Sequence, residues 1–323
     1  MRRALVFLGV LVVLVVTGTS CTGRPPLSVP DGGDDAGTNA DGGLVCQQCM
    51  NVGAAVERGI LGQNSLVETS GLAASRLHPG VLYAHNDSGD FPRFFAIDDR
   101  GAPLGEFSLQ GATAIDWEDI AVGPCPTGSC VYLGDIGANN QYRYQYDIYR
   151  VPEPDVAVGR PAGLVTVTYE RLSFVYSKAA SIDSETLLVH PVTGAVYVIE
   201  KIPLGQNRSS TVYSLAGLAP GPLFVVAQPI ATLTVPRAND VYITAGDIHP
   251  CGNAVLLRTY GGVYRLTLPS GASFDTLFSQ PLEALTPSPP DIFGESITWS
   301  ADGQGYFTTS EGSGQPLYYT GCR

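Results

Sequence analysis

A unit of about 50 residues recurs along the chain, and this repeat restricts the fold more than any other feature. Each copy contains short runs of Val, Ile, Leu, Tyr, Phe and Thr between clusters of Gly, Pro, Asn and Asp, whereas helical periodicity is hard to find. With 38 Gly and 24 Pro among 323 residues, turns must be frequent. A repeat of this length and composition is typical of a β-propeller or a related array.

The repeat predicts an all-β fold, a single β-propeller of four-stranded blades over residues 45–323. Five blades account for the repeats that align, and six or seven are the alternatives if 155–181 or 271–292 contains another. The last unit ends at Cys322 without a fourth strand. We expect the segment 54–61 to supply that outermost strand, because closing the ring removes open sheet edges.

The residues before the repeats have the pattern of an export signal. Basic residues precede the apolar run 4–16, which is too short to span a membrane, so residues 1–20 are predicted to be a signal peptide. Cys21 follows small residues, as in a bacterial lipoprotein cleavage site, and is the predicted lipidation site. Residues 21–44 are predicted to be a flexible tether. This predicts a protein of the cell envelope, on the periplasmic side or the cell surface, held to the membrane by lipid alone, with secretion as the alternative.

Six cysteines remain after Cys21, an even number that suits disulfides in an oxidising compartment. Cys125 and Cys130 flank a turn and are predicted to staple it, and a bond between Cys251 and Cys322 would tie down the C-terminus. The remaining pair, Cys46 and Cys49, forms a C-x-x-C sequence. A disulfide is preferred there over zinc or redox chemistry, since no second ligand pair and no βαβ context is present.

The formal net charge is −12, from 18 basic and 30 acidic residues. This balance argues against nucleic acid as a partner, because phosphate binding needs clustered Lys and Arg. It suits a soluble monomer, cation binding or a basic partner.

Three of the four histidines, His78, His190 and His249, precede proline in equivalent turns of the repeat. Their recurrence at one position predicts a role in the turn and argues against a metal triad. Only His85 stands elsewhere and remains a candidate catalytic base.

Acidic residues recur at the starts of the innermost strands, and polar clusters recur at the ends of the strands that follow. In an up-and-down blade these two positions lie on the same rim, so we expect a ring of carboxylates at one mouth of the central channel. Such oxygens suit Ca²⁺, or Mg²⁺ with water. The predicted metal ligands are Asp116, Glu118, Asp135, Glu185, Asp247 and Glu295.

Other residues of the same rim are predicted to contact a ligand. They are Asn86, Asp87, Asn139, Asn140, Lys201, Arg258, Tyr260 and Glu311. The alternative for each acid is a structural role, solvated or hydrogen-bonded to the backbone of the neighbouring blade. Alternation along the strand places Trp117 opposite Asp116 and Glu118, where it would pack between sheets.

No nucleophile elbow, zinc-protease motif, P-loop or dinucleotide fingerprint is present. If the protein is an enzyme, the candidate catalytic residues are His85, Lys201 and Arg258. No single base can be selected among them.

Several motifs together resemble a group of mostly uncharacterised bacterial exported proteins and lipoproteins. They are SGLAAS (70–75), HNDSGD (85–90), DWEDIA (116–121), GDIGAN (134–139) and TTSEG (308–312). The resemblance implies a propeller with these motifs around one end of its channel. The group is similar, more loosely, to phytase-like and esterase-like propellers. In the phytase propellers clustered acids hold Ca²⁺ and Lys or Arg holds phosphate, although Ala138 here replaces an acid that is frequent in the group.

Two functions are therefore expected. The first is an exported propeller whose acidic mouth, with Ca²⁺ as the expected cation, binds a small molecule or a surface ligand. The alternative is a metal-dependent hydrolase of phosphate or other esters.

Overall fold

The computed structural model describes residues 46, 49, 51–139, 142–177, 181–202, 209–236, 242–290 and 293–323. The predicted signal peptide, Cys21 and nearly all of the tether lie outside these residues. Within them the chain is all-β, as predicted, with a short 3₁₀ helix, η1 (Phe274–Ser279), as the only helical element. None of the described helical residues forms a segment long and apolar enough to cross a membrane.

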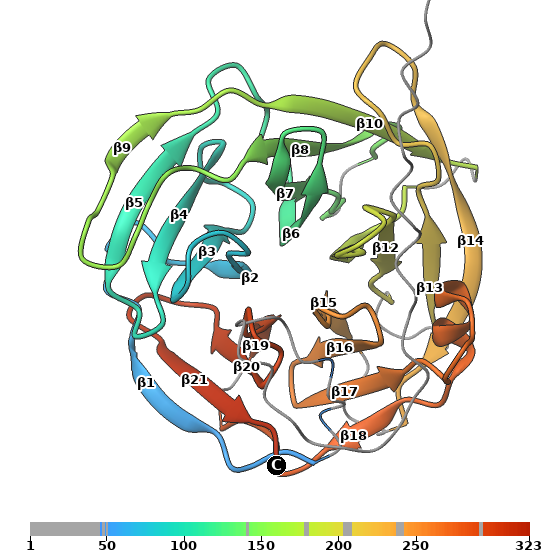
Figure 1. Cartoon of the computed structure of the whole chain (residues 1–323). Coiled ribbons are helices and arrows are strands. Elements are labelled where there is room, and N and C mark those ends of the chain that lie inside the picture. The colour runs from blue at the N-terminus through green and yellow to red at the C-terminus, as the bar shows by residue number, and fades with distance from the viewer. Residues whose placement is uncertain are drawn as a thin grey trace, which may run out of the picture. The chain divides into compact units, whose positions relative to one another are not determined.

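The strands form several sheets, each built largely from consecutive antiparallel strands (Figure 1). One sheet has the order β2 (Thr69–Ala74), β3 (Val81–Asn86), β4 (Arg93–Asp98), β5 (Pro103–Ser108) and β9 (Gly163–Thr166). Another has the order β15 (Ile243–Ile248), β16 (Ala254–Thr259), β17 (Gly262–Thr267) and β18 (Glu283–Leu285).

An eight-stranded sheet contains two sets of four strands. The first set is β6 (Trp117–Cys125), β7 (Gly128–Asp135), β8 (Tyr146–Pro152) and β10 (Glu170–Tyr176). The second is β11 (Ser184–Val189), β12 (Val196–Glu200), β13 (Ser209–Ser214) and β14 (Val225–Thr234). The two sets join through a short parallel pairing of β10 with β14, from Phe174 opposite Val225 to Tyr176 opposite Ala227.

The last sheet contains the first and the last strand of the described chain. Its order is β1 (Val56–Ile60), β21 (Pro316–Gly321), β20 (Gly305–Ser310) and β19 (Gly294–Trp299). β1 is antiparallel to β21, with Val56 opposite Tyr319 and Ile60 opposite Pro316. This confirms the prediction that segment 54–61 adds the outermost strand to the last repeat.

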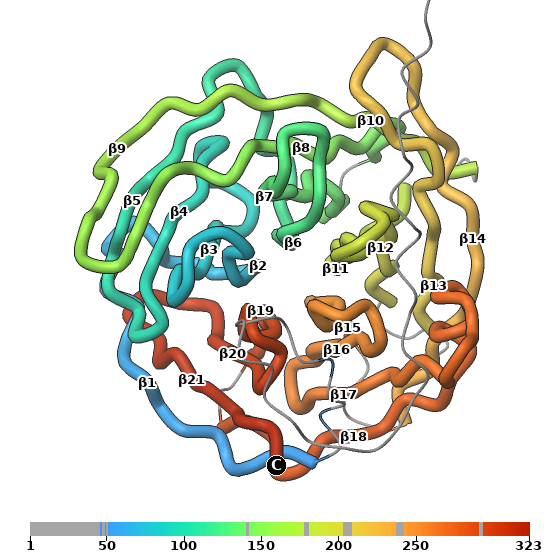
Figure 2. The backbone as a smooth tube through the Cα atoms, in the orientation of Figure 1, coloured from blue at the N-terminus to red at the C-terminus, as the bar shows by residue number. Residues whose placement is uncertain are grey.

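The first strand of each set lies innermost, toward a common centre (Figure 2). In cyclic order β2 contacts β6, β6 contacts β11, β11 contacts β15, β15 contacts β19, and β19 returns to β2. Hydrogen bonds join these strands directly. Examples are Ser70 Oγ to the Glu118 carbonyl (2.6 Å), Leu187 N to Asp119 Oδ2 (2.8 Å), Thr244 Oγ1 to the Gly294 carbonyl (2.8 Å) and Trp299 N to Asp247 Oδ2 (2.9 Å).

Aromatic side chains fill the space between neighbouring sheets. Trp117 is buried, its ring centroid 5.9 Å from that of His85 and 5.8 Å from that of Tyr149. Its indole N–H donates to the Thr113 carbonyl at 3.1 Å, so the polar edge of the ring is also satisfied. The predicted packing of Trp117 between sheets is confirmed.

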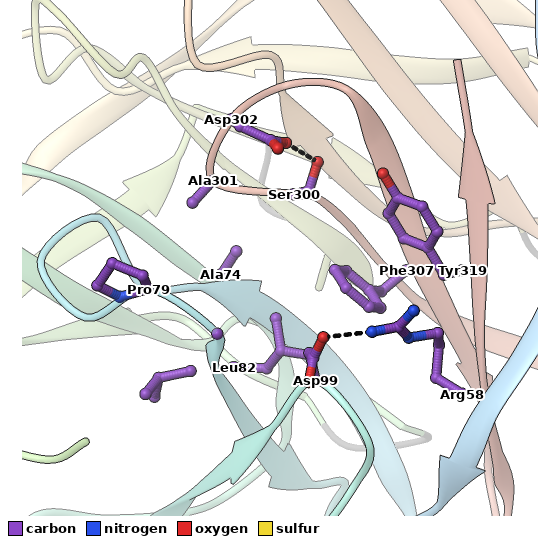
Figure 3. A pocket seen from close by; sticks show the side chains of 12 residues that line it. Arg58, Ala74, Pro79, Leu82, Asp99, Ser300, Ala301, Asp302, Phe307 and Tyr319 are labelled. Carbon is purple, nitrogen blue, oxygen red and sulfur yellow. Dashed lines mark hydrogen bonds and ion pairs between the residues drawn. The ribbon is translucent and has the colours of Figure 1, made fainter. Parts of the chain in front are cut away.

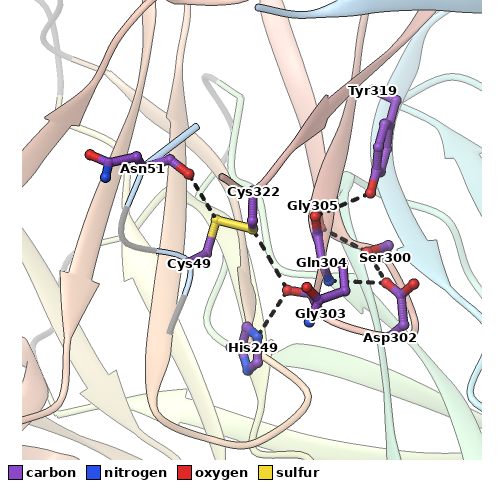
Figure 4. The surroundings of a disulfide bond; sticks show 10 residues. All are labelled: Cys49, Asn51, His249, Ser300, Asp302, Gly303, Gln304, Gly305, Tyr319 and Cys322. Atoms are coloured by element: carbon purple, nitrogen blue, oxygen red, sulfur yellow. Dashed lines mark hydrogen bonds between the residues drawn. A yellow bond between two sulfur atoms is a disulfide. The ribbon is translucent and has the colours of Figure 1, made fainter. Parts of the chain in front are cut away.

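Two disulfides connect the N-terminal segment to distant strands, and this corrects the predicted pairing. Cys46 bonds Cys251, and Cys49 bonds Cys322 (Figure 4). The predicted bond Cys251–Cys322 is therefore wrong. Cys46 and Cys49, predicted to form disulfides without assigned partners, bond different cysteines because chain closure brings each half of the C-x-x-C sequence beside another one. The predicted Cys125–Cys130 bond is present.

The His-Pro turns have the predicted structural role. His190 Nδ1 accepts hydrogen bonds from the backbone N–H groups of Val192 and Thr193, both at 3.2 Å. His249 Nδ1 accepts one from Cys251 N at 3.1 Å. In the equivalent turn the carbonyl of His78 accepts from Val81 N at 3.1 Å.

Candidate metal centre

A break in strand pairing recurs at the start of every innermost strand. On β6, Trp117 lies opposite Asp135 and Asp119 opposite Gly134, so Glu118 has no partner on β7. This is a β-bulge, which turns a side chain out of the regular alternation and is common beside functional sites. The five equivalent bulge residues are Ser70, Glu118, Glu185, Thr244 and Glu295.

These bulges lie at one end of the innermost strands, which we call the mouth. The residues around them form two unlike parts. The acidic half consists of Glu118 and the four acids that surround it, Asp87, Asp116, Asp183 and Glu185. The aromatic half consists of Tyr242, Tyr260 and Phe293, with ring centroids 5.7 Å apart for the two tyrosines and 6.0 Å apart for Tyr260 and Phe293. The ring of carboxylates predicted from the repeat is therefore incomplete.

Glu118 lies at the centre of the acidic half. Its carboxylate belongs to two groups of three acids, one with Asp87 and Asp116 and the other with Asp183 and Glu185. Within each group the ligand oxygens lie within 4.8 Å of one another. The side chain is 2% exposed, and its Oε1 atom has no hydrogen-bond partner among the described residues. A buried carboxylate oxygen without a partner is costly, and either a proton or a bound cation would remove that cost.

The loop after β7 holds the acids in place. Asp116 Oδ2 accepts from the backbone N–H of Asn139 at 2.7 Å, and its Oδ1 accepts from the Asn139 side chain at 3.1 Å. Asp183 Oδ1 accepts from the Ala138 N–H at 2.6 Å, so the position that lacks an acid contributes through its backbone. Gly137 is required between them, because a Cβ there would collide with Glu118 Oε1 and with Asp116.

Lys201 lies between the two halves. Its ammonium forms an ion pair with the Glu185 carboxylate and lies 6.0 Å from the ring centroids of both Tyr242 and Tyr260. Ion pairing and cation–π contact both stabilise the charged ammonium. Accordingly, the pKa of Lys201 is raised by Glu185 despite the opposing effect of burial.

Burial and repulsion between like charges raise the pKa of Glu118, Glu295 and Asp87. Burial, followed by the neighbouring Glu185, Asp87, Asp116 and Asp183, raises the pKa of Glu118 well above its ordinary value. Burial and Glu311 raise the pKa of Glu295 to about 7, and burial raises that of Asp87 to about 6. Like charges this close favour proton uptake or a bound cation.

The structure brings together only some of the predicted metal ligands. Asp116, Glu118 and Glu185 converge, and Glu295 lies near enough to Glu185 to raise its pKa. Asp135 is engaged elsewhere, its Oδ1 accepting from Arg143 at 2.8 Å. Asp247 is not part of the cluster, because its Oδ2 accepts from Trp299 N and Thr298 Oγ1, both at 2.9 Å.

Asp183 was not among the predicted ligands, and Asp87 was predicted only as a ligand contact. Asp183 precedes the bulge residue by two positions, as Asp116 does, so its spacing from Glu185 could have identified it. Asp87 follows directly after β3, and only the folded chain shows that it approaches Glu118.

Several predicted ligand-contacting or catalytic residues are structural. The Asn86 side chain accepts from Val67 N at 2.8 Å and donates to the Ser65 carbonyl at 2.7 Å, which fixes a loop. His85 is fully buried with Nδ1 2.7 Å from the Asn86 carbonyl, and burial lowers its pKa to about 4. Arg258 is fully buried and donates to the Gly262 carbonyl at 3.1 Å. Asn140 lies outside the described residues.

A cavity of about 380 Å³ is separate from the acidic half (Figure 3). Leu82 and Phe307 form part of its lining, and the Arg58–Asp99 ion pair, at 2.6 Å, lies at its edge. Ser300 Oγ donates to Asp302 at 2.6 Å on its other side. None of the acids of the candidate metal centre lines it.

Comparisons with known proteins identify no family. No protein-family model matches the sequence, and a search of curated proteins finds no match. Among solved structures, the chain is similar to that of U3-55K, with 12% sequence identity, a TM-score of 0.39, and coverage of 78% of this chain and 67% of the other.

Proposed function

We propose that the protein is a five-bladed β-propeller that binds a divalent cation, with Ca²⁺ as the best fit, around Glu118. The cyclic contacts of β2, β6, β11, β15 and β19 support this architecture. The eight-stranded sheet is then two blades joined by the short β10–β14 pairing, and β1 completes the fifth blade. Each of the five blades supplies one bulge residue to the mouth.

The observation that carries the proposal is the position of Glu118. Its buried carboxylate is shared by two groups of acids, and one of its oxygens has no partner among the described residues. Ca²⁺ takes six to eight oxygen ligands in flexible geometry, whereas Mg²⁺ demands a tighter octahedron and keeps its water. Five carboxylates from several blades suit the larger ion.

The rest of the mouth suits ligand binding beside the cation. Phe293 is 61% exposed and has φ 54°, a conformation that costs energy for a non-glycine residue. Together with Tyr242 and Tyr260 it forms an accessible aromatic surface next to the acids. We infer that an envelope-located, monomeric protein uses this mouth to hold a small molecule or a surface ligand.

The hydrolase alternative has less support from the same contacts. Phosphate-ester hydrolysis would need cationic side chains free to hold the phosphate. Lys201 is already paired with Glu185, and Arg258 is fully buried. His85, the remaining candidate base, has no solvent exposure.

Calorimetric titration of the purified, chelator-treated protein with Ca²⁺ tests the proposal. The wild type should bind saturably, and Glu118→Gln should lower the affinity at least tenfold because it removes the shared charge without changing side-chain size. Glu283→Gln is the matched control, since Glu283 pairs with Arg265 away from the mouth. Absence of binding by the wild type, or equal binding by Glu118→Gln, would refute the proposal.

A further inference from the structure

The opposite mouth of the channel contains a second cavity, of about 340 Å³. The C-terminal ends of the innermost strands and the turns after them form its wall, contributing Arg76, Val122, Pro124, Pro191, Pro250 and Ala301. These residues come from all five strand sets. Arg76 is the one charged residue among those that line the cavity in the described part of the chain.

Two buried nitrogens of the Arg76 guanidinium lack hydrogen-bond acceptors among the described residues. Its Nε and Nη1 atoms are buried and have no hydrogen-bond partner among the described residues. The backbone of Arg76 is fixed independently, because its N–H donates to Glu153 Oε1 at 3.2 Å. Two of the guanidinium's donor atoms therefore lie at the cavity without a hydrogen-bond partner among the described residues.

Both nearby carboxylates are engaged elsewhere. Glu153 accepts hydrogen bonds from Ser75 Oγ and, at 3.1 Å, from Tyr83 OH. Asp247 accepts from Trp299 and Thr298, although it lies close enough to Arg76 to feel the positive charge. Arg76 thus has unsatisfied donors while its acidic neighbours already have partners of their own.

We propose that this cavity binds a small organic monocarboxylate, with the carboxylate on Arg76 and the apolar body against the proline and valine walls. A planar guanidinium matches a carboxylate in a two-point contact. The apolar wall favours a hydrocarbon body. The nearby charge of Asp247 disfavours anions of higher charge.

Benzoate is the probe, titrated calorimetrically into the purified protein in chloride-free buffer. The wild type should bind saturably, and inorganic phosphate should bind at least tenfold more weakly. Arg76→Lys keeps the charge but loses the planar fork and should weaken benzoate binding at least tenfold, whereas Arg76→Met should abolish it. Arg58→Gln, in the separate cavity of Figure 3, should leave it unchanged.

Three results would overturn the proposal: no saturable benzoate binding by the wild type, undiminished binding by Arg76→Met, or phosphate binding as tight as benzoate binding. Thermal unfolding without ligand provides a second measurement. Arg76→Lys should keep the wild-type Tm, because no protein hydrogen bond from the guanidinium Nε and Nη1 is lost and the positive charge beside Asp247 is retained. A fall of several degrees would show that Arg76 serves the fold and would also overturn the proposal. Neither measurement involves Glu118, so this site and the cation site can fail separately.

Discussion

Asp119 on β6 accepts a hydrogen bond from the backbone N–H of Leu187 on β11 at 2.8 Å, although Asp119 is completely buried. Its other oxygen accepts from Ile120 N at 2.8 Å. The acid beside Glu118 therefore joins two innermost strands. One acidic sequence, Asp116 to Asp119, thus contains two metal-ligand candidates and one structural acid.

Asp119→Ala should lower the free energy of unfolding by about 2–4 kcal/mol, because it leaves buried backbone N–H groups on two strands without an acceptor. Asp119→Asn, which retains one acceptor oxygen, should lose less. Urea unfolding measures both. Asp155→Ala is the control, since Asp155 is exposed and its pair with Arg160 lies on the surface. Equal stability of Asp119→Ala and the control would contradict this role.

Replacing both Cys49 and Cys322 by Ser should destabilise the protein by roughly 5 kcal/mol, since this bond closes a loop of 273 residues. Replacing Cys125 and Cys130, whose loop spans 5 residues, should cost about 2 kcal/mol by the same reasoning. Denaturant titrations under oxidising conditions compare the two double variants. A larger loss for the short loop would be contrary to the expectation.

The pH dependence of stability should contain a contribution from His249. Burial lowers its pKa, and its Nδ1 accepts a hydrogen bond that a protonated ring could not accept. Above about pH 6.5 the ring is neutral in both the folded and the unfolded chain. As the pH falls below that value only the unfolded chain takes up the proton readily, so stability is lost.

His249→Gln should therefore reduce the loss of Tm between about pH 6.5 and pH 5 relative to the wild type. The raised pKa values of the acids act in the opposite direction, but they are common to both proteins and cancel in the comparison. An unchanged pH slope in the variant would exclude this contribution.

Lys201→Met should strengthen Ca²⁺ binding about tenfold. The ammonium neutralises Glu185, and removing it frees that carboxylate and raises the negative potential at the site. Calorimetry with Ca²⁺ measures the change, and Lys201→Arg, which keeps the charge, should stay near the wild-type affinity. Weaker binding by Lys201→Met would show that Lys201 supports the site.

The repeat allowed much of the architecture to be predicted. The last unit has only three strands of its own, so closing the ring requires a fourth strand from the start of the repeat region. This predicted the pairing of 54–61 with β21. Glu118 and Glu185 were found because they occupy equivalent positions of the repeat, and Asp116 because it lies two residues before Glu118. The disulfide pairing was not predictable, since connectivity depends on which strands the N-terminal segment meets after closure.

The assignment of Asp247 shows a second limit. The bulge in its strand falls on Thr244, which has no charge, and Asp247 is the nearest acid after it. Matching acids by sequence therefore selected a residue three positions beyond the bulge, where the side chain bonds to β19. The bulge depends on hydrogen-bond register between two strands, so the spacing of acidic residues alone does not locate it.

A crystal structure of the protein grown with Ca²⁺, with anomalous scattering data to identify the ion, tests the central claim most directly. We predict an ion bound by Glu118 and by carboxylate oxygens of at least two of its neighbours Asp87, Asp116, Asp183 and Glu185. An ordered mouth with no ion at Glu118 at saturating Ca²⁺ would contradict the account.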